Sequence, residues 1–391
     1  MKILFVVIPE KGHINPMIGV AQYLRDRGHT VGFYAGANIQ PQLDKAGLGQ
    51  QLGPRVNRPP ASASRGAEFA AHIQDVAWLR HWIEDLLLSQ SMEALPDLEK
   101  TITDFAADVV VTDPMVYPAA IAAHEGGVPW IAISNSLNPV ITDDIESELL
   151  STVAGLSERR TRLFAEHGMP DAQFSGCDLL SPLLTIAFTT AEFVGERSNV
   201  ELVGPSHPLD ARGDETDFPW QELDERRKLF VSFGSQIYYQ PEFFHKIFEA
   251  SATLDVQVIA AMHQLLDEPD LVPLPPHVLA VRYAPQLQLL SKIDVMITHG
   301  GANSVMEAMA AGVPVMVAPI CNDQFHQAHF VERYGNGCVV DLAHADVTDI
   351  RKACQLLLDD PGIRQVTDKV AKSYAVDGAA AAATLIENSF S

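Results

Sequence analysis

The sequence predicts an α/β protein made of two doubly wound domains. Short apolar runs that stop at Pro or Gly alternate with helical patterns through both halves of the chain. The length of 391 residues exceeds one ordinary hydrophobic core and fits two domains of about 150 to 200 residues each. The composition, 47% hydrophobic and 20% charged, is normal for a globular protein.

The first half opens with a strand, helix, strand pattern. Ile3–Ile8 is an apolar run; Asn15 is the expected N-cap, and Pro16 the first residue, of a helix that Gly28 terminates. Val31–Tyr34 begins the next strand. This order implies a parallel sheet with helices on both faces. Two further strands are predicted at Asp108–Thr112 and Pro129–Ser134.

Residues 206–226 are the predicted interdomain linker, because this segment is rich in Pro, Gly and charge and has no periodic apolar face. It leaves residues 1–205 as the first domain and 227–377 as the second. The Ala-rich end, 378–391, predicts a closing helix. The strands of the second domain are predicted at Lys228–Phe233, Val256–Ala261, Val278–Val281, Asp294–Thr298 and Val315–Ala318.

The net charge of −23 argues against a nucleic acid or an anionic membrane as the main partner, because both need clustered Lys and Arg. No stretch reaches the roughly 18 apolar residues of a membrane span. The apolar run at the start is too short for a signal peptide. The four cysteines show neither paired metal spacing nor a dense disulfide framework. We therefore expect a cytoplasmic protein without a membrane span.

The stretch that follows the strand at Asp294–Thr298 predicts an anion site. Its turn consists of a histidine and small residues that open a helix: His299, Gly300, Gly301, Ala302, Asn303 and Ser304. Backbone N–H groups at such a helix N-terminus bind anions, so we interpret the turn as a diphosphate site. A protonated or hydrogen-bonding His299 can offset the diphosphate charge without a metal. Glu307 is either a ligand for ribose hydroxyls or an ordinary surface carboxylate near the positive end of the helix dipole.

His13 lies in the predicted loop after the first strand, and Asp113 follows the strand that ends at Thr112. If these strands are neighbours, the two side chains converge at the carboxyl edge of the sheet, where ligands collect in open α/β folds. A neutral imidazole can then take a proton from a hydroxyl while the carboxylate holds its tautomer. The alternative is a turn histidine and an aspartate that caps the turn at Pro114. Position alone leaves both open.

Three aromatic residues, Phe69, Trp78 and Trp82, lie on a helical stretch after a Pro-rich and Ser-rich segment. One interpretation is core packing, since large apolar residues are usually buried. The other is a pocket for an acceptor molecule, because ligand clefts are also rich in aromatic side chains.

Several other chemistries lack their motifs. There is no GxxxxGK[ST] loop for a P-loop NTPase and no Asp-x-Asp pair for a metal-held diphosphate. The zinc patterns HExxH and CxxC and a strict GxGxxG after a strand are also missing. We therefore expect no metal and no resident cofactor.

Motifs in both halves carry a family resemblance. They are Gly12-His13-Ile14-Asn15-Pro16, Tyr283-Ala284-Pro285-Gln286, Thr298 to Ser304 with Glu307, Gly312-Val313-Pro314 and Asp323-Gln324. Together they resemble the small-molecule glycosyltransferases that use UDP- or dTDP-sugars. The resemblance implies the GT-B fold, in which two Rossmann-like domains face each other and the C-terminal helix returns to the first domain. It also implies an inverting transfer of a hexose, glucose or a deoxysugar such as rhamnose, to a hydroxyl of a lipophilic or phenolic small molecule.

The resemblance also assigns roles to single residues. His13 would be the general base and Asp113 its partner. Tyr283 stands where many relatives place a Trp that stacks on the nucleobase. The other implied donor contacts are Gln286 with base and ribose, Glu307 with the ribose hydroxyls, Ser235, His299, Gly301, Ala302, Asn303 and Ser304 with the diphosphate, and Asp323 and Gln324 with the sugar.

Two alternatives belong to other functional classes. One is a nucleotide-sugar epimerase or hydrolase on the same scaffold, which would need neither the His13 loop nor an acceptor pocket. The other is a non-catalytic protein that activates a partner glycosyltransferase; such a protein could lose His13, Asp113 or Glu307, which are all present. For the transferase the expected partners are a sugar nucleotide and a small-molecule acceptor, and the expected state is a monomer or a weak homodimer.

Overall fold

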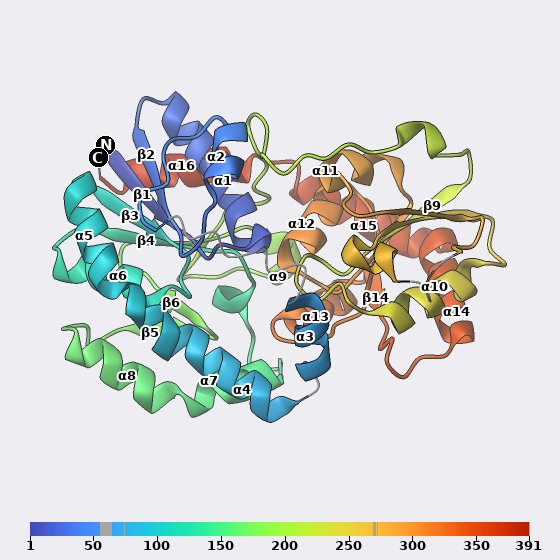
Figure 1. The fold of residues 1–391 in the computed structure, drawn as a ribbon, viewed down its shortest axis with the longest axis horizontal. Helices are drawn as coiled ribbons and strands as arrows, with labels where there is room; N and C mark the ends of the chain where they lie inside the picture. The colour runs from blue at the N-terminus through green and yellow to red at the C-terminus, as the bar shows by residue number, and fades with distance from the viewer. Residues whose placement is uncertain (55–64, 74, 269–270, 272, 391) are drawn as a thin grey trace. The chain divides into compact units, whose positions relative to one another are not determined.

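The computed structural model describes residues 1–54, 65–73, 75–268, 271 and 273–390, and it divides into two compact units (Figure 1). Unit 1 holds the described residues of Met1–Arg58, Asp75–Asp214 and Val376–Ser391. Unit 2 holds those of Pro59–Gln74 and Glu215–Ala375. The chain therefore passes from unit 1 to unit 2 inside the segment predicted as a linker, and its last residues return to unit 1.

Unit 1 contains a six-stranded sheet whose neighbouring strands all pair in parallel, in the order β2-β1-β3-β4-β7-β8. The strands are β1 (Lys2–Val6), β2 (Thr30–Tyr34), β3 (Val109–Thr112), β4 (Trp130–Ser134), β7 (Thr185–Ala187) and β8 (Glu201–Leu202). The first four match the predicted runs within two residues. The last two have three and two residues, too few to give a periodic signal.

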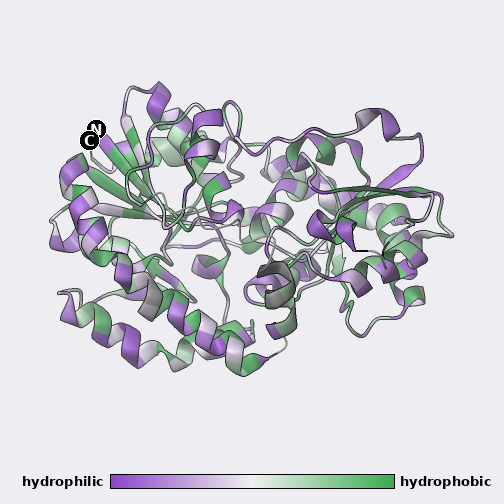
Figure 2. Cartoon of the chain, in the orientation of Figure 1, coloured by the Kyte–Doolittle hydropathy of each residue, from purple (hydrophilic) through white to green (hydrophobic). Residues whose placement is uncertain are grey.

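The apolar runs of the sequence form the buried centre of unit 1. All four residues of β3 and all five of β4 are buried, which is the pattern of central strands covered on both faces. Figure 2 shows these strands as hydrophobic, whereas many helices carry one hydrophobic and one hydrophilic face. The register pairs Val6 of β1 with Thr112 of β3, so the residues that follow these strands emerge at one edge of the sheet.

Helix α1 (Lys11–Asp26) begins five residues earlier than predicted. Its N-cap is Glu10, whose carbonyl accepts hydrogen bonds from the N–H groups of His13 and Ile14, both at 2.9 Å. Pro16 lies inside the helix, where its ring nitrogen cannot donate a hydrogen bond to the preceding turn. The expected N-cap at Asn15 is therefore wrong. His13 lies in the first helical turn rather than in a loop.

Unit 1 also contains a small antiparallel hairpin, β5 (Gln173–Ser175) and β6 (Asp178–Leu180), which is not part of the six-stranded sheet but contacts its strand β4. The closing helix α16 (Gly378–Asn388) packs against α1, where Arg27 donates to Glu387 at 2.6 Å. The other α-helices of this unit are α2 (Gln40–Lys45), α4 (Val76–Glu84), α5 (Leu95–Phe105), α6 (Tyr117–Glu125), α7 (Glu148–Gly155), α8 (Ser157–Glu166) and α9 (Ala191–Val194).

Unit 2 repeats this design with a second parallel sheet of six strands, in the order β11-β10-β9-β12-β13-β14. The strands are β9 (Arg227–Ser232), β10 (Val256–Ala261), β11 (Val278–Val281), β12 (Val295–Thr298), β13 (Val315–Val317) and β14 (Gly337–Val339). Its α-helices are α3 (Arg65–His72), α10 (Pro241–Ser251), α11 (Gln286–Leu289), α12 (Ala302–Ala310), α13 (Gln324–Tyr334), α14 (Val347–Asp359) and α15 (Pro361–Ser373). The predicted two doubly wound α/β sheets are confirmed.

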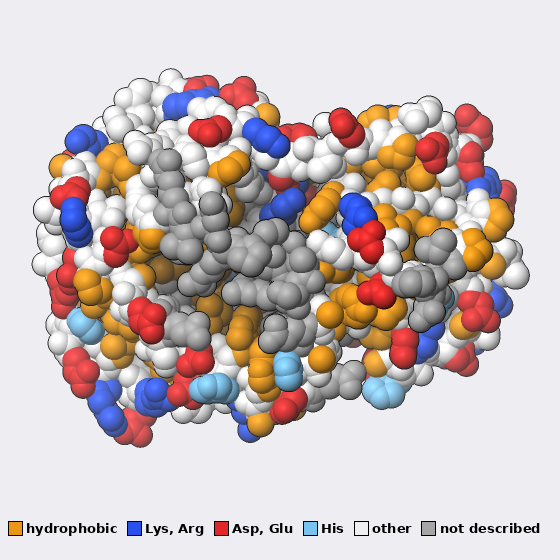
Figure 3. Space-filling view, viewed as in Figure 1, with side chains coloured by type: hydrophobic (Ala, Val, Ile, Leu, Met, Phe, Trp, Pro, Cys, Tyr) orange, Lys and Arg blue, Asp and Glu red, His pale blue; other side chains and the backbone are white. Residues whose placement is uncertain are grey.

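The surface and the helix lengths bear on the expected partners. On the face shown in Figure 3, the described Lys and Arg side chains are interspersed with Asp and Glu and with apolar side chains. Among the described residues, no helix combines the length and the apolar character that a membrane crossing requires.

Candidate active site

His13 and Asp113 form a close pair at the carboxyl edge of the unit 1 sheet. Nδ1 of His13 lies 2.5 Å from Oδ2 of Asp113, and the two side chains are 27% and 2% exposed. The pair forms because β1 and β3 are parallel neighbours, and because α1 starts early enough to place His13 in its first turn. An almost buried carboxylate therefore faces a ring that stays accessible to solvent.

Asn135 completes this group. Its Nδ2 donates to Oδ2 of Asp113 at 3.0 Å and to the carbonyl oxygen of His13 at 3.3 Å. The second carboxylate oxygen of Asp113 accepts from the N–H of Met115 at 3.0 Å. Asn135 is not among the residues that the sequence predicts for this site. It directly follows β4, the neighbour of β3. Asp113 was predicted because side chains at the carboxyl ends of parallel strands gather at one edge of the sheet, and the same reasoning applies to Asn135.

The geometry fixes which ring nitrogen can act as a base. Nδ1 of His13 donates its hydrogen to Asp113, so in the neutral ring the lone pair is on Nε2. When Nε2 takes a proton, the adjacent carboxylate stabilises the imidazolium. This is the arrangement of a general base with an orienting acid.

The turn after β12 opens helix α12 in unit 2, as predicted. Gly301 is the N-cap, with φ −60° and ψ 134°, and it has no side-chain oxygen that could cap the first helical turn. Ala302, Asn303 and Ser304 form that turn, and all three are partly exposed. The nine-residue helix thus directs the N–H groups of its first turn toward the position where the sequence predicts a diphosphate.

The ring of His299 lies close to two glycines of this site. A Cβ atom on Gly234 would lie 2.7 Å from its ring, and one on Gly301 would lie 2.6 Å from it. Although the residue is partly exposed, burial among protein atoms lowers the pKa of His299 to about 4. The ring is therefore neutral at pH 7. Of the two forms expected, the hydrogen-bonding histidine fits this environment and the protonated one does not.

A pH dependence of stability follows for His299 and for His326, a buried residue of α13 whose pKa burial also lowers to about 4. The unfolded chain binds protons at these positions below about pH 6.5 while the folded chain does not. Stability should therefore fall as the pH drops from about 6.5 to 4, by roughly 3 kcal/mol for each histidine. In urea titrations the free energy of unfolding should depend less on pH for H326Q, while H245Q, at an exposed position of α10, should keep the wild-type pH dependence.

Glu307 and Gln286 lie together beside the α12 N-terminus. Glu307 is only 4% exposed, and its Oε2 accepts from Nε2 of Gln286 at 2.7 Å. Nε2 of Gln286 also lies 3.4 Å from Oγ of Ser304. The interpretation of Glu307 as an ordinary surface carboxylate is therefore wrong. Two residues 21 positions apart meet here because α11 and α12 begin at the same edge of the sheet.

The other predicted donor residues lie at the carboxyl ends of strands in unit 2. Ser235 follows β9, and Tyr283 follows β11, where its ring meets the ring of His263 edge-on at 4.5 Å. Asp323 is the partly exposed N-cap residue of α13. Gln324 is buried, and its Oε1 accepts from the N–H groups of Ile320 and Cys321 at 2.8 and 3.1 Å. These two hydrogen bonds stabilise the loop before α13.

The predicted acceptor residues Trp78 and Trp82 lie one turn apart on α4. Their rings stack at 6.3 Å with an angle of 7° and pack against the buried core of unit 1. Both residues are partly exposed, so each contributes to the core and to the surface. The side chain of Phe69 lies outside the described residues.

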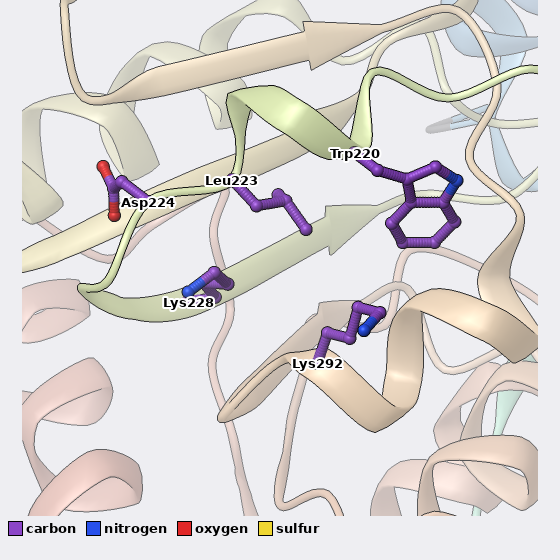
Figure 4. Close-up of a pocket in the computed structure, with 5 residues that line it drawn as sticks. All are labelled: Trp220, Leu223, Asp224, Lys228 and Lys292. Atoms are coloured by element: carbon purple, nitrogen blue, oxygen red, sulfur yellow. The ribbon is translucent and has the colours of Figure 1, made fainter.

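A pocket of about 430 Å³ in unit 2 is separate from these residues (Figure 4). It is lined by Trp220, Leu223, Asp224, Lys228 and Lys292. Lys228 is the second residue of β9, and Lys292 precedes β12, so the pocket lies at the amino ends of these strands. Ligands of open α/β sheets collect at the opposite edge, where the predicted donor residues are.

Comparisons with known proteins cover the whole chain. NDP-glycosyltransferase YjiC of Bacillus subtilis (strain 168) is 27% identical over 372 residues, spanning 92% of this chain and 89% of that protein. The 4'-demethylrebeccamycin synthase of Lentzea aerocolonigenes is 26% identical over 425 residues, spanning 99% of each chain. Residues 245–384 match the C-terminal domain of the family described as erythromycin biosynthesis protein CIII-like.

Solved structures show the same fold. The glycotransferase of kitacinnamycin superposes with a TM-score of 0.78 at 23% identity, covering 100% of this chain and 99% of that one. The spinosyn rhamnosyltransferase SpnG, complexed with thymidine diphosphate, superposes with a TM-score of 0.75 at 18% identity, covering 99% and 100%. The chain is a GT-B glycosyltransferase.

The family match falls on one part of this glycosyltransferase. It spans α12, Glu307 and Asp323, hence most of the predicted donor residues in unit 2. The His13 and Asp113 pair lies outside the matched range, in the half that only the full-length relatives cover. The predicted GT-B fold and the enzyme class are thus confirmed, while the roles of single residues stay predictions.

Proposed function

We propose that this glycosyltransferase moves a hexose, glucose or a deoxysugar such as rhamnose, from UDP or dTDP to a hydroxyl of a lipophilic or phenolic small molecule. The observation that carries the proposal is the His13–Asp113 pair, with 2.5 Å between Nδ1 and Oδ2 and an accessible imidazole. A base of this kind serves an acceptor that must lose a proton as it attacks. The donor site alone would not need it.

The proposed reaction is one in-line displacement that inverts the anomeric carbon. Nε2 of His13 takes the proton of the acceptor hydroxyl as its oxygen bonds to the anomeric carbon. The bond from that carbon to the diphosphate oxygen breaks, and the electron pair leaves with the nucleotide. The N–H groups at the start of α12 stabilise the charge that develops on the diphosphate. Residues of this chain thus supply both the base and the anion site, and we propose that no metal takes part.

Three observations support a sugar nucleotide as the donor. SpnG binds thymidine diphosphate in its solved structure, and the relative from Bacillus subtilis is an NDP-glycosyltransferase. In this chain the buried Glu307 faces Gln286 at the start of α12, where a carboxylate can accept hydrogen bonds from ribose hydroxyls. The 3′-hydroxyl is present in both UDP and dTDP, so Glu307 suits either nucleotide.

The acceptor class rests on the relatives and on unit 1. The names of the 4'-demethylrebeccamycin synthase and the kitacinnamycin glycotransferase indicate natural-product acceptors, which supports a small lipophilic acceptor here.

We further propose a cytoplasmic protein that acts as a monomer or a weak homodimer. The four cysteines are free thiols, which suits a reducing compartment.

The function is tested by a screen of UDP- and dTDP-sugars against phenolic, macrolide and sterol acceptors. Mass spectrometry should detect a product heavier by one hexose or deoxyhexose for at least one pair, and NMR of that product should show the inverted anomer. Each donor is also incubated without acceptor. Rapid conversion of the free sugar nucleotide with no transfer to any acceptor would refute the proposal in favour of an epimerase or hydrolase.

Replacing Asp113 with asparagine should lower kcat by a factor of about 100 or more, because the amide neither holds the required tautomer of His13 nor stabilises the imidazolium. The KM for the donor should stay within about twofold, since Asp113 belongs to unit 1 and the predicted donor residues to unit 2. Steady-state kinetics measures both. D108N, at an exposed position one strand length away, is the matched control and should keep wild-type kinetics. An unchanged kcat in D113N would contradict the assigned role.

A further inference from the structure

A second aspartate lies behind the His13–Asp113 pair and has no part in the reaction proposed above. Asp178 is the first residue of β6 and is 1% exposed. Its Oδ1 accepts from Nδ2 of Asn138 at 2.9 Å, and its Oδ2 shares a short hydrogen bond with the hydroxyl of Ser134. An isolated buried carboxylate is costly, so its partners and its charge state call for a reason.

The two partners of Asp178 flank Asn135. Ser134 ends β4, and Asn138 starts the short helix η3 (Asn138–Val140), so Asp178 fixes both ends of the segment 134–138. Between these points Asn135 reaches Oδ2 of Asp113 at 3.0 Å. The position of Asn135 against the reacting pair therefore depends on where Asp178 holds this segment.

The hairpin that carries Asp178 is itself fixed in place. The Tyr117 hydroxyl donates to the carbonyl oxygen of Cys177 at 2.8 Å, and Nη1 of Arg160 donates to that of Gly176 at 2.9 Å. Both donors come from helices of unit 1, α6 and α8, and both are buried. Asp178 thus sits on a rigid support rather than on a loose loop.

We propose that Asp178 is a positioning residue that fastens segment 134–138 and so holds Asn135 against the Asp113 carboxylate. The proposal rests on the proposed function of His13 and Asp113. It adds a residue to that site from outside the parallel sheet. Asp178 touches no substrate in this scheme: it acts through Asn135 and, once ionised, through its charge on His13.

The charge state of Asp178 suits this role. Burial raises the pKa of Asp178 to about 7; nearby Asp113 raises it further, while Ser134, Asn138 and His13 lower it. The other polar groups next to it, Tyr117 and Arg160, point to the hairpin backbone. In its neutral form the acid donates to Oγ of Ser134. The Ser134 hydroxyl can then donate to the carbonyl oxygen of Ser136, which lies 3.3 Å from Oγ. When Asp178 is neutral, the two neighbouring carboxyl groups of Asp113 and Asp178 together carry one negative charge instead of two.

This arrangement predicts how two substitutions differ. In D178N the amide Nδ2 can donate to Ser134 and the oxygen can accept from Asn138, so every hydrogen bond of the neutral acid is reproduced. D178A removes both contacts and leaves Ser134 and Asn138 without their partner. Kinetics should therefore show kcat reduced by about tenfold or more in D178A with an unchanged KM for the donor, and most of the loss restored in D178N. D171N, at an exposed position before the same hairpin, is the control.

The pH profile separates positioning from simple structural support. When Asp178 ionises above pH 7, its charge stabilises the imidazolium of His13, so the wild type should show a second inflection of kcat/KM near pH 7. D178N should lack that inflection. Equal losses of kcat in D178N and D178A, or an unchanged inflection in D178N, would overturn the proposal.

Two measurements need no substrate, so they decide the matter even if no acceptor is found. Stability linked to Asp178 is present below about pH 4 and is lost as the pH rises through 7, because the folded chain holds a proton that the unfolded chain has released. The urea midpoint of D178N should therefore gain on the wild type between pH 4.5 and 8. NMR of labelled histidines should show that, above pH 7, the His13 ring carries its extra proton less often in D178N than in the wild type, because the amide has no charge. If neither quantity changes, Asp178 does not influence the pair.

Discussion

Replacing His13 with alanine should lower kcat for an alcohol or phenol acceptor by about three orders of magnitude, because no other group then accepts the hydroxyl proton. The dissociation constant of the sugar nucleotide should stay within about twofold, since the predicted donor residues belong to unit 2 and His13 to unit 1. Kinetics at saturating donor and calorimetry with UDP or dTDP measure the two quantities. A more acidic acceptor should lose less, because it needs less help to shed its proton.

The control for H13A is H124A. His124 lies on the same unit, in the last turn of α6, and is exposed, so its loss should change neither kcat nor donor binding. The role of His13 would be refuted by wild-type turnover in H13A, or by a loss that H124A shares.

Replacing Gly301 with alanine should weaken binding of the sugar nucleotide by about 10- to 100-fold. The new Cβ atom would lie 2.6 Å from Nε2 of His299, a ring that leaves no room for a Cβ atom at Gly234 either. Either the ring or the start of α12 must then move, at a cost of about 1–3 kcal/mol. Because φ of Gly301 is −60°, the backbone itself tolerates alanine, so the effect reports the crowding alone. Calorimetry with the donor measures it.

G155A is the matched control for G301A. A Cβ atom at Gly155 would meet nothing within 4 Å, so alanine there should leave donor affinity and folding as they are. If G301A binds the donor as tightly as the wild type does while its folding is intact, the α12 N-terminus is not the diphosphate site.

The strands could be predicted from the sequence because they are buried and continuous. Val109–Thr112 and Trp130–Ser134 are apolar up to their last residue, which is Thr or Ser, and this gives a clear signal in a single sequence. Short strands such as Glu201–Leu202 give none, since two residues show no period. The start of α1 was misplaced because Asn15 and Pro16 form a good local N-cap signal, which the hydrogen bonds to the Glu10 carbonyl override.

The site was predictable where a side chain directly follows a parallel strand. Asp113 and His299 both do so, and strand ends gather at one edge of a sheet; Ser235, three residues after β9, was named through the family resemblance alone. Asp178 could not be found this way, because it begins a short antiparallel strand outside that sheet. The pKa of His299 was equally out of reach, since it depends on how closely Gly234 and Gly301 approach the ring in space.

The return of the C-terminus to unit 1 affects the order in which the chain can fold during synthesis. Unit 2 is complete once Ala375 has left the ribosome, whereas unit 1 still lacks Val376–Ser391 at that point. Unit 1, which holds His13, is therefore completed after unit 2, although β1 of unit 1 is made before any strand of unit 2. A premature stop before Val376 would leave unit 2 whole and strip α1 of its contact with Glu387, so such a truncation would damage the half that holds His13.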